Sequence, residues 1–184
     1  MSLSTDLLDV LSPGNKVFVA FSGGLDSTAL LFLCNKALKQ KKIRNLQAIH
    51  INHNLSENSD KWEQHCERFC KSNNIEFKSF IIEVTKNRSS IESQARQERY
   101  KIFESLLDEN DQILLAHHRD DVFETLLLRL FRGTGVDGLS GLNEKRSLGK
   151  GEIIRPFLNS SKSDLKIYID ENDLQYVEAV SYTH

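Results

Sequence analysis

The chain has 184 residues, a formal net charge of −2 at pH 7 and 39% apolar residues. This length is enough for one well-buried domain, so we expect residues 1–184 to form a single domain. No apolar run approaches the roughly 20 residues that cross a bilayer, and residues 1–6 lack the features of a signal peptide, so we expect no membrane segment. Three cysteines, an odd count, favour a reduced, cytoplasmic protein. The charge excludes a global basic field, so any RNA would have to be held by local patches.

Apolar periodicity and turn residues predict strands that alternate with helices. The predicted strands are residues 17–21, 46–52, 76–84, 112–116 and 153–154, and the predicted helices are residues 27–39, 58–72, 91–107 and 121–131. A final helix is expected after a capping box at residues 161–164, and the glycine-rich residues 133–150 are expected to form a loop. This order predicts an α/β fold, with a mostly parallel sheet of five or six strands and helices on both faces, a three-layer arrangement of the Rossmann type. Ligand loops then lie at the carboxyl ends of the strands.

The string Ser-Gly-Gly-Leu-Asp-Ser at residues 22–27 lies between the first strand and the first helix and predicts a phosphate site. Its glycines allow backbone angles and a close ligand approach denied to other residues, and the helix start offers unpaired N–H groups. Ser22 and Ser27 add hydroxyl donors. The carboxylate of Asp26 would repel phosphate unless a cation lay between them, which indicates Mg²⁺. The string has neither the lysine of the Walker loop nor the spacing of dinucleotide sites.

Two further groups of candidates follow predicted strands. His50 and Asn52 share one strand face, and a lone histidine at such a place is more often structural than functional. Residues 117–121 are five consecutive ionisable residues directly after a buried strand, which is costly unless they are solvated, paired or used. A solvated helix start is one interpretation, because aspartates suit the positive end of a helix. A zinc site is another, but no cysteine or third histidine is spaced to complete it.

Residues 22–27 resemble the pyrophosphate-binding loop of the PP-loop enzymes, the N-type ATP pyrophosphatases. Residues 117–141 read His-His-x-Asp-Asp-x-x-Glu-Thr-x-Leu-Leu-Arg-Leu-x-Arg-Gly-Thr-Gly-x-x-Gly-Leu-x-Gly, a pattern that resembles the tRNA(Ile)-lysidine synthetases. The strings Glu-x-x-Ala-Arg-x-x-Arg-Tyr at residues 92–100 and Arg-Pro-Phe-Leu at residues 155–158 resemble the same family. The resemblance covers residues 16–177 and departs at Val122, Phe157 and residues 178–184. It is a resemblance to the catalytic domain, without the family's C-terminal RNA-binding regions.

The resemblance implies a fold like that of the adenine nucleotide alpha hydrolases. It also implies a ligase that uses ATP, Mg²⁺ and free lysine to convert the wobble cytidine of tRNA(Ile) into lysidine through an adenylated cytidine. The implied ATP contacts are Phe21, Ser22, Gly23, Gly24, Leu25, Asp26, Ser27, Ile51, Asn52, His53, His117 and Gly133. The implied catalytic residues are Asp26, His117, His118, Asp120, Asp121 and Asp137, with Asp26 and Asp121 as metal ligands. Arg96, Arg99, Arg129 and Arg132 suit phosphate groups of ATP or RNA. A homodimer is compatible with the resemblance, although the sequence does not determine the oligomeric state.

Two alternatives stay open at this point. A tRNA thiolase of the same superfamily would typically carry Cys-x-x-Cys pairs, whereas Cys66 and Cys70 are four residues apart in a predicted helix, a spacing that favours core packing. A non-catalytic ATP-binding fragment is the second alternative. Basic residues such as Lys145, Arg146 and Lys150 are usually solvated, and contact with tRNA is the other interpretation of them.

Overall fold

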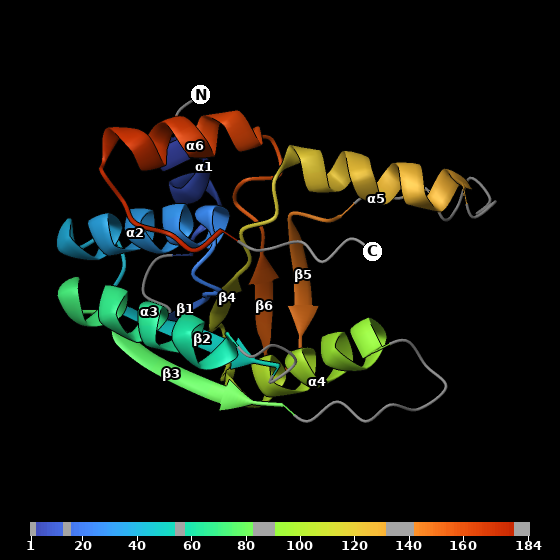
Figure 1. Cartoon of the computed structure of the whole chain (residues 1–184), viewed down its shortest axis with the longest axis horizontal. Coiled ribbons are helices and arrows are strands. Elements are labelled where there is room, and N and C mark those ends of the chain that lie inside the picture. The colour runs from blue at the N-terminus through green and yellow to red at the C-terminus, as the bar shows by residue number, and fades with distance from the viewer. Residues whose placement is uncertain (1–2, 13–15, 54–57, 83–90, 132–141, 179–184) are drawn as a thin grey trace.

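A six-stranded sheet forms the centre of the computed structural model, which describes residues 3–12, 16–53, 58–82, 91–131 and 142–178 (Figure 1). Its strands lie in the order β3-β2-β1-β4-β6-β5, and all neighbours pair in parallel except β5 and β6. The predicted α/β fold with a mostly parallel sheet is therefore confirmed. The strands are β1 (Lys16–Ala20), β2 (Asn45–Asn52), β3 (Glu76–Ile81), β4 (Gln112–Leu114), β5 (Lys145–Leu148) and β6 (Gly151–Ile154).

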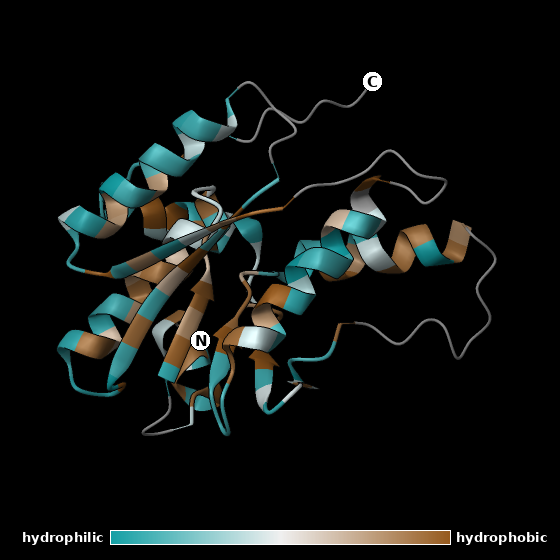
Figure 2. Ribbon diagram, turned by 90° about the horizontal axis from the view of Figure 1, so that it is seen from below, coloured by the Kyte–Doolittle hydropathy of each residue, from teal (hydrophilic) through white to brown (hydrophobic). Residues whose placement is uncertain are grey.

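Helices cover both faces of the sheet, as the three-layer prediction requires. The helices are α1 (Leu3–Val10), α2 (Leu25–Lys39), α3 (Ser59–Ser72), α4 (Ile91–Leu106), α5 (Arg119–Phe131) and α6 (Lys162–Glu171). Because strand side chains alternate, Val17 and Val19 pack with α1, α2, α3 and α6, whereas Phe18 packs with Phe103 of α4 on the opposite face. Apolar residues accordingly follow the inner strands (Figure 2). α5 extends away from the sheet and has no buried residue (Figure 1).

The prediction of a loop over residues 133–150 is wrong for its last part. Lys145–Leu148 form β5, which pairs antiparallel with β6 across a turn at Gly149 and Lys150. Gly149 has a φ of +56°, a conformation that favours glycine. The strand escapes an apolar-periodicity argument because it is an edge strand in which Leu148 alone is buried.

Several element ends differ from the predictions by a few residues. α1 is absent from the predicted elements, because its buried residues, Leu7 and Val10, make too short an apolar pattern. α5 begins at Arg119 rather than at residue 121, since a carboxylate oxygen of Asp121 accepts the backbone N–H of His118 at 2.8 Å and so lies within the first turn. The capping box of α6 is confirmed by reciprocal bonds between Ser161 and Asp164. In the described ranges, none of the helices is both long and apolar enough to serve as a membrane span.

Candidate functional site

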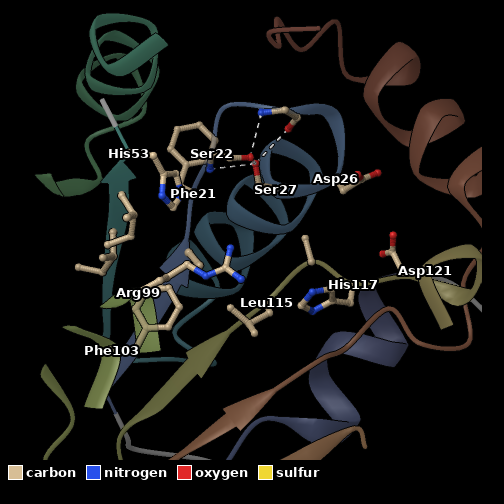
Figure 3. A pocket seen from close by; sticks show the side chains of 15 residues that line it. Phe21, Ser22, Asp26, Ser27, His53, Arg99, Phe103, Leu115, His117 and Asp121 are labelled. Carbon is tan, nitrogen blue, oxygen red and sulfur yellow. Dashed lines mark hydrogen bonds between the residues drawn. The ribbon is translucent and has the colours of Figure 1, made fainter. Parts of the chain in front are cut away.

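The loop between β1 and α2, residues 22–27, is held together by its own hydroxyl groups, and we call it the phosphate loop. Ser27 Oγ donates to the carbonyl oxygen of Gly24 at 3.1 Å and accepts the backbone N–H of Ser22 at 3.3 Å. The hydroxyl oxygens of Ser22 and Ser27 lie 3.0 Å apart (Figure 3). Gly24 directly precedes α2, so the loop leads into the first turn of this helix, where the backbone N–H groups have no partner within the helix. Such a helix start is suited to binding phosphate.

The two glycine positions of the phosphate loop differ in whether their backbone angle and surroundings require glycine. Gly23 has a φ of +81°, and a Cβ placed on it would lie 2.9 Å from Sγ of Cys66 in α3. Gly24 has a φ of −73°, which other residues adopt, and a Cβ placed on it would meet no atom closer than 3.5 Å. The backbone freedom that the sequence offers is therefore used at Gly23, whereas Gly24 has an angle open to other residues.

A pocket of about 290 Å³ opens beside the phosphate loop, at the carboxyl ends of β1, β2 and β4 (Figure 3). β1 lies between β2 and β4, so the strand order reverses at β1 and β4. Open parallel sheets bind their ligands at such a reversal. The pocket is lined by Ala20, Phe21, Ser22, Gly24, Asp26, Ser27, Ile49, Ile51, His53, Arg99, Phe103, Leu115, Ala116, His117 and Asp121.

The structure brings together many, but not all, of the residues that the sequence singles out. The lining contains the predicted residues Phe21, Ser22, Gly24, Asp26, Ser27, Ile51, His53, Arg99, His117 and Asp121, but not Gly23, Leu25, Asn52, Arg96, His118, Asp120 or Arg129. Arg132, Gly133 and Asp137 lie outside the described residues. Ala20, Ile49, Phe103, Leu115 and Ala116 line the pocket without having been predicted. Their apolar pattern indicates only a core, and the place of Ala20, Leu115 and Ala116 at strand ends was the one available signal.

Three carboxylates converge on the buried side chain of His118, which is 4% exposed. Its Nε2 lies 3.7 Å from Oδ1 of Asp26, and its Nδ1 lies 3.5 Å from Asp120 Oδ2 and 3.6 Å from Asp121 Oδ2. Asp120 also accepts the backbone N–H of Lys162 at 2.8 Å, at the start of α6. His118 therefore joins the phosphate loop to the first turn of α5.

The carboxylate of Asp26 is the strongest indication of a cation. Its Oδ1 is buried and has no hydrogen-bond partner among the described residues. Burial raises the pKa of Asp26, and the carboxylate of Asp121 raises it further, while His118 and Lys162 lower it. A divalent cation between Asp26 and Asp121 would relieve the burial and the repulsion together, and carboxylates that share an ion with substrate phosphates suit Mg²⁺.

A zinc site needs more protein ligands than Mg²⁺ does. Within the part of the chain that the structure describes, no group of three or more His, Cys, Asp or Glu side chains is arranged to hold a metal ion.

The pocket disfavours the charged form of two histidines in its lining. Burial, helped by the positive charge of Arg155, lowers the pKa of His117 to about 4. Burial and then Arg99 lower the pKa of His53. Nδ1 of each ring is buried and has no hydrogen-bond partner in the described chain. A neutral imidazole can donate or accept one hydrogen bond, so these rings suit an uncharged group such as a nucleobase.

His50 and Asn52 make contacts within the fold. Nδ1 of His50 lies 2.8 Å from the carbonyl oxygen of Phe21, which agrees with the structural interpretation of a lone histidine. Asn52 Nδ2 donates to Oε2 of Glu63 in α3 at 2.7 Å. These bonds hold the end of β2 against β1 and α3, and so help to shape the pocket.

The fold and the site together define an α/β protein with a phosphate-type loop and a pocket at the carboxyl ends of a parallel sheet. Within this class of α/β proteins, residues 3–183 match the family model described as "PP-loop domain". The chain belongs to the PP-loop domain family.

Three curated relatives of this chain carry the same name. The chain is 43% identical over 176 residues to the tRNA(Ile)-lysidine synthase of Legionella pneumophila (strain Lens), a match that covers 96% of this chain and 40% of the relative. The synthase of Pseudomonas syringae pv. tomato is 41% identical, with 96% of this chain and 40% of the relative covered. That of Coxiella burnetii is 41% identical, with coverages of 93% and 38%. The chain thus spans about two fifths of the length of these relatives.

A solved structure confirms the fold. The U34-tRNA thiolase NcsA from Methanococcus maripaludis with its [4Fe-4S] cluster matches with a TM-score of 0.75 and 22% identity. The match covers 99% of this chain and 67% of the thiolase chain. At this identity the likeness concerns the fold alone.

Proposed function

We propose that this chain is the ATP-dependent catalytic part of an enzyme that ligates lysine to C2 of the wobble cytidine in tRNA(Ile). The observation that carries the proposal is the pocket where the phosphate loop, Asp26, Asp121 and His117 meet, in a chain 43% identical to a synthase of that name. In this reaction O2 of cytosine attacks the α-phosphate of ATP, and pyrophosphate leaves. The amine of lysine then displaces AMP from C2 and loses a proton.

The phosphate loop would hold the leaving pyrophosphate. Negative charge grows on this group during the first step, so preorganised donors stabilise it. The hydroxyl groups of Ser22 and Ser27 and the N–H groups at the start of α2 are such donors. The apolar wall that β1, β2 and α4 contribute to the pocket is suited to the flat adenine ring.

Asp26 and Asp121 would hold Mg²⁺ beside the phosphate loop. When bound, the ion would neutralise charge on the phosphates of ATP. His118 touches both carboxylates from a buried position, outside the pocket lining. We therefore assign His118 a positioning role for Asp26 and Asp121.

The cytosine ring that receives lysine would contact His117. A neutral imidazole can hydrogen-bond to the edge of cytosine without a charge of its own, and His117 is neutral at pH 7 because its pKa is about 4. The proton of the lysine amine needs a base, for which the sequence suggests Asp120, Asp121, Glu124 or Asp137. Of these, Asp121 lines the pocket, whereas Asp120 accepts the backbone N–H of Lys162 at the start of α6. Asp137 lies outside the described residues.

The cysteines argue against the thiolase alternative. Cys34, Cys66 and Cys70 are each 0% exposed in the core. Burial raises the pKa of Cys66 and of Cys70 to about 12, which disfavours the thiolate that sulfur transfer requires. Their packing in the core confirms the interpretation of the four-residue spacing.

Release of pyrophosphate, assayed with ATP, tRNA(Ile) and lysine each omitted in turn, tests the proposed function. We expect pyrophosphate release to depend on tRNA(Ile) and release of AMP to depend on lysine, and we expect tRNA(Ile) with uridine at the wobble position to be inactive. Asp26→Asn should slow pyrophosphate release by about 100-fold or more, whereas Asp60→Asn, an exposed aspartate at the start of α3, should leave it unchanged. ATP binding without turnover would favour the non-catalytic fragment, and dependence on sulfide would favour the thiolase.

A further inference from the structure

Four arginines surround one tyrosine on the α4 side of the sheet, and we call them the arginine cluster. The guanidinium carbons of Arg96, Arg99 and Arg146 lie 5.0, 5.8 and 5.3 Å from the ring centre of Tyr100. Arg96 Nη2 donates to the hydroxyl oxygen of Tyr100 at 3.2 Å, and the side chain of Arg155 lies beside Tyr100 as well. The cluster thus joins α4 to the hairpin of β5 and β6.

No described carboxylate forms an ion pair with any member of the cluster. Arg155 is 3% exposed, and although its Nη1 donates to the carbonyl oxygen of Asn143 at 2.7 Å, its Nε has no partner among the described residues. Nε of Arg99 is buried and without a described partner in the same way. Burial lowers the pKa of both arginines. Buried guanidinium groups that repel one another are costly, and the ring of Tyr100 offsets only part of that cost.

The cluster borders the pocket of the proposed reaction. Arg99 lines the pocket and extends into it from the side away from Asp26 and Asp121 (Figure 3). Arg155, Arg99 and Arg96 all lower the pKa of His117. The phosphate loop and the arginine cluster therefore provide two separate sites for negative charge, with the pocket between them.

We propose that the arginine cluster binds a backbone phosphate of the RNA, next to the nucleotide whose base enters the pocket. This inference rests on the proposed function. Guanidinium groups bind phosphate oxygens in a forked geometry, and Arg96 and Arg146 are exposed, so a macromolecule can reach them. Free lysine carries a net charge of about +1 at neutral pH, so its two ammonium groups disfavour the cluster relative to an RNA phosphate. The pyrophosphate part of ATP already has its own site on the phosphate loop.

The hairpin of β5 and β6 offers a matched control for the test. Arg146 pairs with Ile153, a residue of the α4-side core, so the two side chains point to the α4 face. Lys145 pairs with Ile154, a residue of the opposite core, and is exposed. Arg146→Gln and Lys145→Gln therefore remove the same charge from adjacent residues on opposite faces of one strand.

The test is the affinity of the purified chain for a tRNA(Ile) transcript over a range of salt concentrations, with ATP affinity measured in parallel. We expect Arg146→Gln to weaken tRNA binding by about tenfold and to make the slope of log affinity against log salt shallower by about 0.7 to 0.9, the effect of losing one phosphate contact. Lys145→Gln should change tRNA affinity by less than about twofold, and neither variant should change ATP affinity. Arg96→Gln should act like Arg146→Gln, because both side chains are exposed.

Four outcomes would overturn the inference, and a fifth would contradict the proposed function alone. Equal tRNA affinity and salt slope for the two glutamine variants would remove the cluster from the RNA interface. A loss of ATP affinity in Arg146→Gln with unchanged tRNA binding would assign the cluster to a phosphate of ATP, and a raised KM for lysine would assign it to the lysine carboxylate. A wild-type chain that binds no tRNA at any salt concentration would also overturn it. Binding of tRNA without pyrophosphate release would instead leave the cluster in place and contradict the proposed function.

Discussion

At Gly23 the backbone takes a φ of +81°, and a Cβ atom placed on this residue would lie 2.9 Å from Sγ of Cys66. The carbonyl oxygen of Gly23 also accepts the backbone N–H of Val177 at 2.8 Å. The conformation of this one residue therefore places the phosphate loop against both α3 and the chain after α6. At Gly24, by contrast, neither the backbone angle nor the surrounding space requires glycine.

Gly23→Ala is expected to destabilise the fold by about 1–2 kcal/mol from backbone strain alone, with an added cost from contact with Cys66. Gly24→Ala serves as the matched control, and its effect on stability should be well under that of Gly23→Ala. Urea unfolding followed by circular dichroism measures both. Equal stability of the two variants would show that the backbone at Gly23 is not strained by a side chain.

The pocket histidine His117 links stability to pH. Its pKa is about 4 in the folded chain and rises to an ordinary value near 6.5 on unfolding, so the unfolded state binds more protons between these values. The free energy of unfolding should therefore fall as the pH drops from about 6.5 towards 4. In His117→Gln this contribution is absent, so the variant should lose less stability than the wild type between pH 7 and pH 5. Urea titrations of both proteins at the two pH values measure the difference, and identical losses would contradict it.

At the scale of elements, α6 shows how a short polar string determines where a helix begins. The backbone N–H of Asp164 donates to Ser161 Oγ at 3.2 Å, and Asp164 Oδ2 accepts the backbone N–H of Ser161 at 2.8 Å. Leu165 and Ile169 of the same helix are buried in the core that contains α2. Both the capping and the packing therefore favour the helix in its observed position.

Ser161→Ala should lower the free energy of unfolding by about 1 kcal/mol, the usual cost of losing a helix cap. Ser105→Ala is the control, because Ser105 is exposed on α4 and its hydroxyl donates only to the carbonyl oxygen of Ile102 within its own helix. Thermal unfolding of the three proteins is the measurement. A Ser105→Ala change as large as that of Ser161→Ala would remove the special role of the cap.

At the scale of the whole molecule, the sheet separates two cores. One contains the three cysteines together with α1, α2, α3 and α6, and the other contains Phe103 of α4. Because each cysteine is 0% exposed, thiol chemistry should report opening of the first core.

The thiols of Cys34, Cys66 and Cys70 are expected to react slowly with a thiol reagent such as DTNB in the native protein. Burial raises the pKa of all three, so both access and thiolate formation are suppressed. In guanidinium chloride all three should react at once. Bound ATP should slow the native reaction further if it stabilises the fold. Rapid labelling of any cysteine in the native protein would contradict the packing of this core.

The sequence by itself determined the α/β fold, the phosphate loop and the candidates at the strand ends. Local patterns are sufficient for these features, because alternation and helical periodicity depend on near neighbours, and parallel strands bring their carboxyl ends to one edge. The edge strand β5 cannot be predicted from such local patterns. Its charged residues carry no apolar pattern, and only backbone pairing with β6 makes it a strand.

The tertiary structure alone decided which candidates meet. It placed His118 among three carboxylates outside the pocket lining, gave Asp120 a bond to the start of α6, and showed that apolar side chains such as Phe103 line the pocket. It also brought Arg146 and Arg155 to Tyr100, residues about 50 positions apart in the chain. Contacts of this kind depend on the packing of distant elements, and the energy of a buried charge depends on its surroundings, so neither can be inferred from local sequence.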